Sequence, residues 1–121
     1  MTVEHPQDEA GLRAVGRAVA DVLARMLAAV EPGMTTAELD ALGEGWLAEH
    51  GARSAPRLSY DFPGATCISI NEEAAHGIPG GRRIAPGDVV NVDVSAELDG
   101  YFADTGGTTV APPAGPVERR L

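Results

Sequence analysis

The sequence predicts an α+β fold in which two helices cover one face of an antiparallel sheet. Two observations lead to this prediction. Apolar residues recur at helical spacing in two segments before residue 50, and they alternate with polar residues in a segment after residue 88. Because the helical segments precede the strand segments, the elements are expected to separate into layers. The 121 residues suffice for one small domain with a hydrophobic core.

The first helix is predicted over residues 10–30. Its apolar residues recur at steps of three and four, which places them on one face of a helix. They are Val15, Val19, Val22, Leu23, Met26 and Val30. The run Glu31-Pro32-Gly33 then ends the helix, because proline and glycine both interrupt helical hydrogen bonding.

A second helix is predicted to begin after Thr35, which with Glu38 three residues later forms the sequence signature of a capping box. Gly51 is expected to end it. Its apolar stripe, which we expect in the core, consists of Leu39, Leu42, Trp46 and Leu47. Gly43 and Gly45 each cost such a helix about 1 kcal/mol relative to alanine. Both glycines therefore indicate close packing against a neighbouring element.

The segments between the second helix and the last apolar run carry few periodic signals. Residues 52–64 are predicted to be irregular, residues 66–70 to form a short strand, and residues 71–83 to form a glycine-rich loop. Residues 1–9 are expected to be a flexible N-terminus. Residues 111–121 are expected to be a proline-rich linker followed by the start of a truncated helix.

A β-hairpin is predicted around Asp99-Gly100, which suits a two-residue type I′ turn because both central residues need positive φ. The first strand alternates with a period of two: Val90, Val92, Val94, Ala96 and Leu98 alternate with Asn91, Asp93, Ser95, Glu97 and Asp99. A two-residue turn pairs Leu98 with Tyr101 and Ser95 with Asp104.

This register places Asp93 and Asp104 on the same face as diagonal neighbours, whose backbones lie roughly 7–8 Å apart. Two converging carboxylates repel each other unless a proton or a cation lies between them, and a divalent ion with oxygen ligands suits the position. The alternative is that both aspartates form the solvated face of a half-buried hairpin.

Composition excludes several kinds of partner. A formal net charge of −9 argues against direct binding of nucleic acid or of an anionic membrane surface. The single cysteine, Cys67, permits no intrachain disulfide and fits a reducing compartment. The first residues lack the basic start and apolar run of a signal peptide. We therefore expect a cytoplasmic protein with no membrane contact.

Three further motifs stand near the hairpin. The first is Cys67-Ile68-Ser69-Ile70-Asn71-Glu72, and the second is His76-Gly77-Ile78-Pro79. The third begins at Gly87-Asp88 and continues through Asp93 to Asp104-Thr105. Together with the upstream segment from Glu31 to Leu39, they resemble type I methionine aminopeptidases. These are metallopeptidases of the pita-bread fold, in which helices cover a curved antiparallel sheet. The resemblance extends over residues 10–110.

The resemblance implies a role for each matching residue. Asp93 and Asp104 correspond to two ligands of a site for two divalent metal ions, which could be cobalt, manganese, iron or zinc. His76 corresponds to a catalytic histidine that contacts the substrate and does not bind metal. Tyr60, Phe62 and Cys67 correspond to the wall of the pocket for a methionine side chain.

Each of these residues also has a structural alternative. Cys67 could be a small buried hydrophobe. Tyr60 and Phe62 could cover the core, and His76 could be an ordinary loop histidine.

The resemblance also implies ligands that this chain does not carry. The family's site takes one histidine and two glutamates from its second half, whereas Glu118 is the only such residue after Asp104 here. We therefore expect residues 10–110 to be the N-terminal half of the aminopeptidase domain. The chain is expected to be a truncated or partial sequence, or the product of a split gene, that needs the missing C-terminal half for activity.

Three functions remain in competition. The first is removal of the N-terminal methionine from nascent peptides. The second is a proline-directed exopeptidase of the same fold, such as a prolidase or an aminopeptidase P, which the residues around His76 disfavour. The third is a binding module that keeps the fold without metal or catalysis.

Overall fold

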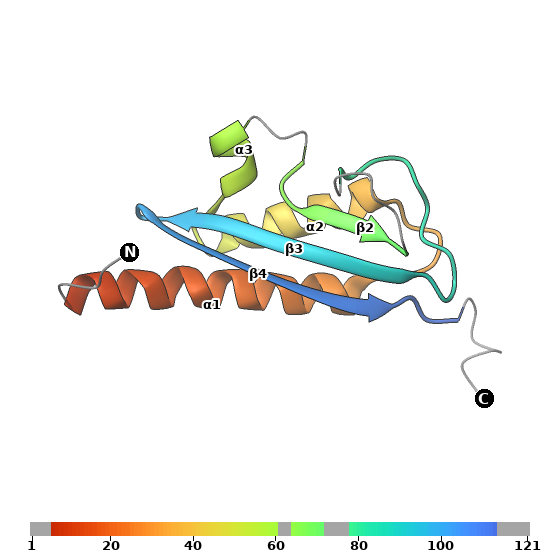
Figure 1. Ribbon diagram of the computed structural model, residues 1–121, viewed down its shortest axis with the longest axis horizontal. Helices are drawn as coiled ribbons and strands as arrows, with labels where there is room; N and C mark the ends of the chain where they lie inside the picture. The colour runs from red at the N-terminus through yellow and green to blue at the C-terminus, as the bar shows by residue number, and fades with distance from the viewer. Residues whose placement is uncertain (1–5, 61–63, 72–77, 114–121) are drawn as a thin grey trace.

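The computed structural model of the chain describes residues 6–60, 64–71 and 78–113 (Figure 1). Their elements follow the order α1 (Pro6–Ala29), α2 (Thr36–Glu49), β1 (Arg53–Ser54), α3 (Ala55–Tyr60), β2 (Cys67–Ile70), β3 (Val89–Leu98) and β4 (Tyr101–Val110). Helices and antiparallel strands form separate layers, which confirms the predicted α+β class.

Strand β3 is the centre of the sheet. It pairs along its whole length with β4 on one edge, and with β2 and β1 in turn on the other edge. All pairings are antiparallel, and Cys67 of β2 lies directly opposite Asp93 of β3.

The hairpin of β3 and β4 has the predicted register, with Leu98 opposite Tyr101 and Ser95 opposite Asp104. Its turn residues Asp99 and Gly100 have φ angles of 53° and 89°. Positive φ at both positions is what a type I′ turn requires. The turn therefore determines which face each side chain of β4 occupies.

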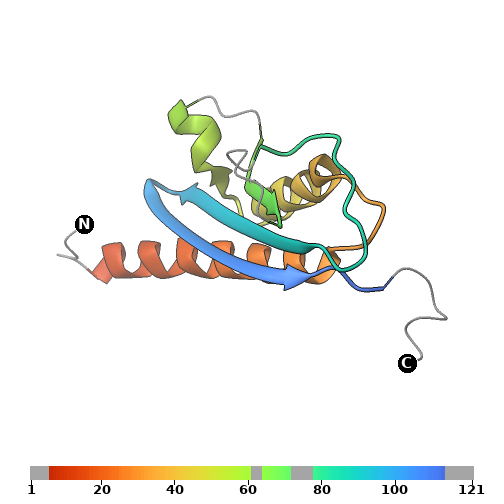
Figure 2. The same ribbon diagram turned by 45° about the vertical axis from the view of Figure 1, so that its right-hand side comes forward.

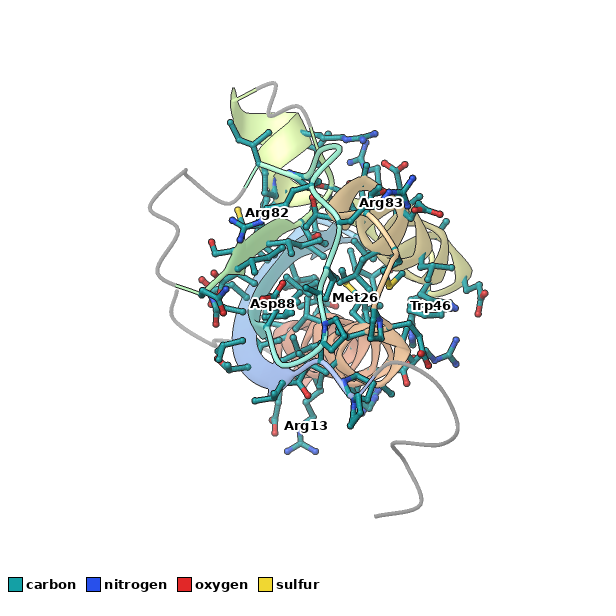
Figure 3. The ribbon with its side chains drawn as sticks, turned by 90° about the vertical axis from the view of Figure 1, so that its right-hand side faces the viewer. Arg13, Met26, Trp46, Arg82, Arg83 and Asp88 are labelled. Carbon is teal, nitrogen blue, oxygen red and sulfur yellow. The ribbon has the colours of Figure 1, made fainter. Side chains whose placement is uncertain are left out.

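Both long helices lie on one side of the curved sheet (Figures 1 and 2). Helix α1 runs along the hairpin, and α2 lies beside it behind β2 and β3. The view along the helices shows Met26 between the helices and the sheet, and Trp46 on the side away from the sheet (Figure 3). The core is aliphatic, and its fully buried members include Val22, Met26, Leu39, Ile68 and Val92.

The predicted apolar face of the first helix is confirmed, because all six of its residues are buried; five lie in α1, and Val30 follows its last residue. The predicted start of α2 is also confirmed. Thr35 accepts a hydrogen bond from the Glu38 amide at 3.0 Å, and Glu38 accepts one from the Thr35 amide at 2.8 Å. Gly51, with a φ of 74°, follows the end of α2 as expected.

Two predictions about α2 are wrong. Leu42 is 41% exposed, although we expected it in the core. The buried face of the helix is centred on Thr36, Asp40, Gly43 and Leu47, and Leu42 lies at its flank. A β-carbon on Gly45 would meet nothing within 4 Å, so Gly45 marks no close packing, whereas Gly43 packs against Met26.

Two further differences concern tertiary contacts. The segment predicted to be irregular contains β1 and α3, because Arg53 and Ser54 pair with Glu97 and Ala96 of β3. Glu97, expected on the polar side of its strand, is only 7% exposed, since Arg53 and the hairpin turn close over it.

The ends of the chain bear on the predicted domain limits. Helix α1 already begins at Pro6, so residues 6–9 are helical rather than part of a flexible N-terminus. Residues 1–5 and 114–121 lie outside the described residues, so the predicted truncated helix lies there too. No described helix combines the length and the apolar character needed to cross a bilayer.

Candidate functional site

The outer face of the hairpin is polar because the strand alternation turns its apolar partners toward the helices. Val90, Val92, Val94 and Ala96 are completely buried against the helical layer. The residues between them point the other way and meet outward-facing residues of β4. Asn91 lies opposite Thr108, Asp93 opposite Gly106, and Ser95 opposite Asp104.

This register brings Asp93 and Asp104 together as predicted. Asp104 lies one step along the face from Asp93, on the neighbouring strand. Both residues are exposed, and they line a shallow hollow of about 250 Å³ together with Ser95, Thr105 and Gly106.

The Asp93 carboxylate leans across the sheet toward β4. A β-carbon on Gly106 would lie 2.2 Å from Asp93 Oδ1, so the carboxylate occupies space that only a glycine leaves open. On its other side, Asn91 Nδ2 lies 3.4 Å from Asp93 Oδ2, and Asn91 in turn accepts a hydrogen bond from Thr108. Asp93 is thus directed toward the strand that carries Asp104.

The chemistry of this pair fits a divalent cation. Carboxylate oxygens are ligands that hard and borderline divalent ions accept. Among the described residues, no side chain donates a hydrogen bond to Asp104, so its oxygens are available. The described residues contain no group of three or more histidine, cysteine, aspartate or glutamate side chains placed to hold a metal ion. The pair therefore presents two of the ligands that such a site would need.

Cys67 lies beside this pair. It is directly opposite Asp93, so both side chains project from the same face of the sheet. Burial raises the pKa of the Cys67 thiol, and the negative charges of Asp93 and Asp40 raise it further. The thiol therefore stays protonated near neutral pH and offers a soft, weakly polar surface next to the carboxylates.

The other predicted substrate residues are Tyr60, Phe62 and His76. Phe62 and His76 lie outside the described residues, and Tyr60 is the last residue of α3, with a backbone position only. Their predicted roles stay predictions.

The end of β2 is held at Asn71, the last described residue before the segment that contains His76. Asn71 adopts a left-handed φ of 56°, its side chain donates to Asp88, and it accepts from the Val89 amide at 2.9 Å. Hydrogen bonds from the Ala85 amide and from Asn71 hold the pKa of Asp88 below its usual value. The chain leaves β2 at Asn71 in a conformation fixed by β3.

Sequence reasoning missed three polar residues that support this region: Thr36, Asp40 and Asn91. Asn91 could have been found, because it lies two residues before Asp93 and therefore shares its face. Thr36 and Asp40 gave no comparable signal, since polar residues in a helix normally face solvent.

Comparisons with known proteins bear directly on this site. The family model described as metallopeptidase family M24 matches residues 10–121. The chain is 51% identical over 107 residues to methionine aminopeptidase 2 of Bacillus subtilis, a match that covers 88% of this chain and 43% of that protein.

Solved structures agree with this match. The methionine aminopeptidase of Rickettsia prowazekii is similar with a TM-score of 0.82 and 32% identity, covering 99% of this chain and 48% of that one. The methionine aminopeptidase of Thermotoga maritima is similar with a TM-score of 0.85 and 26% identity, covering 100% and 49%. The chain thus spans less than half the length of these relatives, and its fold is the expected half of theirs.

Proposed function

The chain belongs to metallopeptidase family M24, and from this premise we propose that it forms the metal-binding and substrate-binding half of a methionine aminopeptidase. The observation that carries the proposal is the pair of carboxylates on one face of the hairpin, Asp93 and Asp104, in a chain that is 51% identical to such an enzyme. The proposed reaction is hydrolysis of the bond after an N-terminal methionine in peptides.

In this proposal Asp93 and Asp104 hold two divalent ions, whose identity among cobalt, manganese, iron and zinc is left to measurement. When bound, such ions supply an activated water, because they lower its pKa toward neutrality. Asp93 and Asp104 fix the position of the metal ions, since both side chains project from one rigid two-stranded ribbon. Asn91 keeps the Asp93 carboxylate directed toward β4.

The substrate side of the proposal rests on residues around β2. Cys67, beside Asp93, offers a sulfur surface to the thioether of a methionine side chain. Tyr60 and Phe62 complete the apolar wall, and His76 donates a hydrogen bond to the peptide carbonyl as negative charge develops on its oxygen. The N-terminal amine of the substrate is thereby held next to the carboxylates.

The proposed partners are a peptide with an N-terminal methionine and the polypeptide that completes the length of the relatives. The remaining ligands, one histidine and two glutamates by resemblance, come from that polypeptide. A reducing cytoplasmic location belongs to the same proposal and is supported by the lone cysteine. The net charge of −9 supports the absence of direct nucleic-acid contacts.

The experiment that tests this function measures release of methionine from a Met-Ala-Ser peptide in the presence of divalent metal. The chain is assayed alone and after addition of a polypeptide that supplies the rest of the relatives' length. We expect activity in the completed protein and its loss in Asp93→Asn and in Asp104→Asn. Asp99→Asn is the matched control, because it removes the same charge from the hairpin turn, away from the hollow.

Two outcomes would replace the proposal. Cleavage of a Xaa-Pro peptide in preference to the methionyl peptide would identify a proline-directed exopeptidase. Absence of any cleavage by the completed protein, together with unchanged folding, would favour a non-catalytic binding module.

A further inference from the structure

Helix α2 carries two buried polar residues on the face that it turns toward the sheet and its loops. Thr36 is 4% exposed and Asp40 is 6% exposed, and they lie one helical turn apart. A buried carboxylate loses its hydration, so it is retained only where hydrogen bonds replace the lost water. Both side chains form such hydrogen bonds with the backbone of distant segments.

Asp40 holds the segment that leads into β2. Its Oδ2 accepts a hydrogen bond from the Ala65 amide at 3.0 Å, and its Oδ1 accepts one from the Thr66 amide at 2.7 Å. The Thr66 hydroxyl donates to the same Oδ1. Thr66 is completely buried and immediately precedes Cys67. Asp40 thus fixes the backbone one residue before the side chain that lies beside Asp93.

Thr36 holds the segment on the far side of the loop. Its hydroxyl accepts a hydrogen bond from the Gly80 amide at 2.8 Å and lies 3.2 Å from the Gly80 carbonyl oxygen. The Ala37 amide donates to the same carbonyl at 3.0 Å. The first turn of α2 is therefore bonded to the backbone that follows His76-Gly77-Ile78-Pro79 in the sequence.

The segment before Cys67 and the Pro79–Gly80 segment pack against each other next to Asp40. A β-carbon on Gly64 would lie 2.8 Å from Pro79 Cδ and 3.3 Å from Asp40 Oδ2. The backbone at Gly64 therefore packs against the Pro79 ring with no room for a side chain. One helix face sets the separation between the strand that bears Cys67 and the segment after His76.

We propose that Thr36 and Asp40 are positioning residues for substrate recognition, which hold the backbone before Cys67 and the Pro79–Gly80 segment in place and so set the position of Cys67 in the proposed methionine pocket. The inference rests on the proposed function, since it assigns the pocket to methionine. Neither residue touches the substrate or the carboxylates of the hairpin. An apolar residue at position 40 would leave the Ala65 and Thr66 amides without an acceptor, so Asp40 contributes to stability as well, and the test needs readouts that stability alone does not move.

The test uses Asp40→Asn, which keeps the shape of the side chain and removes its charge, and Thr36→Val, which removes only the hydroxyl. In the active protein, each is expected to raise the KM for a methionyl peptide about tenfold or more with little change in kcat, because a small displacement of the pocket wall weakens binding. Thr36→Ser restores the hydroxyl and is expected to return KM to the wild-type value.

The second readout needs no activity. The chain has one cysteine, so a thiol-alkylating reagent reports on the position of Cys67 alone. The alkylation rate is measured as a function of pH, which gives the rate constant of the Cys67 thiolate separately from the pKa of the thiol. We expect this rate constant to rise about tenfold in both variants, as it does when a local segment opens more often.

Glu38→Gln is the matched control. It weakens the capping box in the same turn of α2, and the hydrogen bonds of Glu38 go to Thr35 rather than to Ala65, Thr66 or Gly80. Unchanged KM and alkylation in Asp40→Asn and Thr36→Val would overturn the inference, as would equal changes in Glu38→Gln. If the wild-type protein releases no methionine, the proposed function fails, and an alkylation rate that rises only in the two α2 variants still supports the positioning role.

Discussion

Gly43 and Gly45 lie two residues apart on α2 and have opposite surroundings. Gly43 is buried, and a β-carbon there would lie 2.5 Å from Met26 Sδ and 2.9 Å from Met26 Cε. Gly45 is exposed and has open space around the same position. The close approach of α2 to α1 therefore depends on one of the two glycines.

We predict that Gly45→Ala raises the free energy of unfolding by up to about 1 kcal/mol, because alanine favours the helix. Gly43→Ala gains the same helical preference but forces the fully buried Met26 to move, which costs about 1–3 kcal/mol. Urea unfolding of both variants measures the difference. Equal stabilisation by the two substitutions would show that Met26 yields without cost and that the close packing is unimportant.

At the level of single residues, the sequence predicted what depends on local chemistry. The caps at Thr35 and Gly51 and the turn at Asp99-Gly100 are local signals, and all three are confirmed. Gly43 and Gly45 were indistinguishable in the sequence, because their difference lies entirely in the partner helix. Asp40 has the same limitation, since its hydrogen-bond partners are about 25 residues away.

Glu97 connects three elements at one end of the sheet. Its Oε1 accepts hydrogen bonds from Arg53 of β1 at 2.8 Å, and its Oε2 accepts one from the Gly100 amide in the hairpin turn at 2.6 Å. The Gly100 amide and then Arg53 hold the pKa of Glu97 below its usual value of 4.5. Since the ionised form is favoured in the folded state, its contribution to stability is complete above that value.

We therefore predict that the stability advantage of the wild type over Glu97→Gln is greatest near neutral pH. It should shrink as the pH falls below about 4.5, through the pKa of the folded state, because the carboxylate is then protonated in both folded and unfolded chains. Urea midpoints measured across this range provide the check, with Asp99→Asn as a variant that removes a charge from the same hairpin. A difference that stays constant with pH would exclude a role for the Glu97 charge.

Among the elements, periodicity predicted the long ones and missed the short ones. Helix α1 and the two hairpin strands each carry enough periodic residues to be recognised, and their register follows from the turn. Strand β1 has only two residues. It forms because the backbone of β3 provides hydrogen-bonding partners for it. Helix α3 has Pro56 in its first turn, a position that suits proline. Proline is also common where helices and strands end, so Pro56 did not predict a helix.

Among the described residues, the helices cover one face of the sheet and leave the outer face of the hairpin exposed. The helices bury the apolar side of the hairpin, and the outer side carries Asp93 and Asp104 at its centre. Phe102 and Val110, at either end of the same outer face, are 53% and 60% exposed.

The placement of the two carboxylates on one face could be predicted, because it follows from the alternation of side chains in one hairpin. Alternation and a two-residue turn suffice to place both carboxylates on one face, with no knowledge of the helices. The supports of the site could not be predicted in the same way. Thr36 and Asp40 act through contacts between α2 and distant loops, and a sequence shows such contacts only after the fold is known.

The central claim is that Asp93 and Asp104 bind the same metal centre, and paramagnetic broadening by Mn²⁺ tests it most directly. Amide resonances of the chain are recorded during addition of Mn²⁺, in the presence of the polypeptide that supplies the remaining ligands, and the metal is then removed with EDTA. We predict reversible broadening centred on residues 93 and 104, abolished alike by Asp93→Asn, by Asp104→Asn and by the double variant, because the two ligands act as one unit. Asp99→Asn should leave it intact. Broadening centred elsewhere, or unchanged in both single variants, would contradict the account.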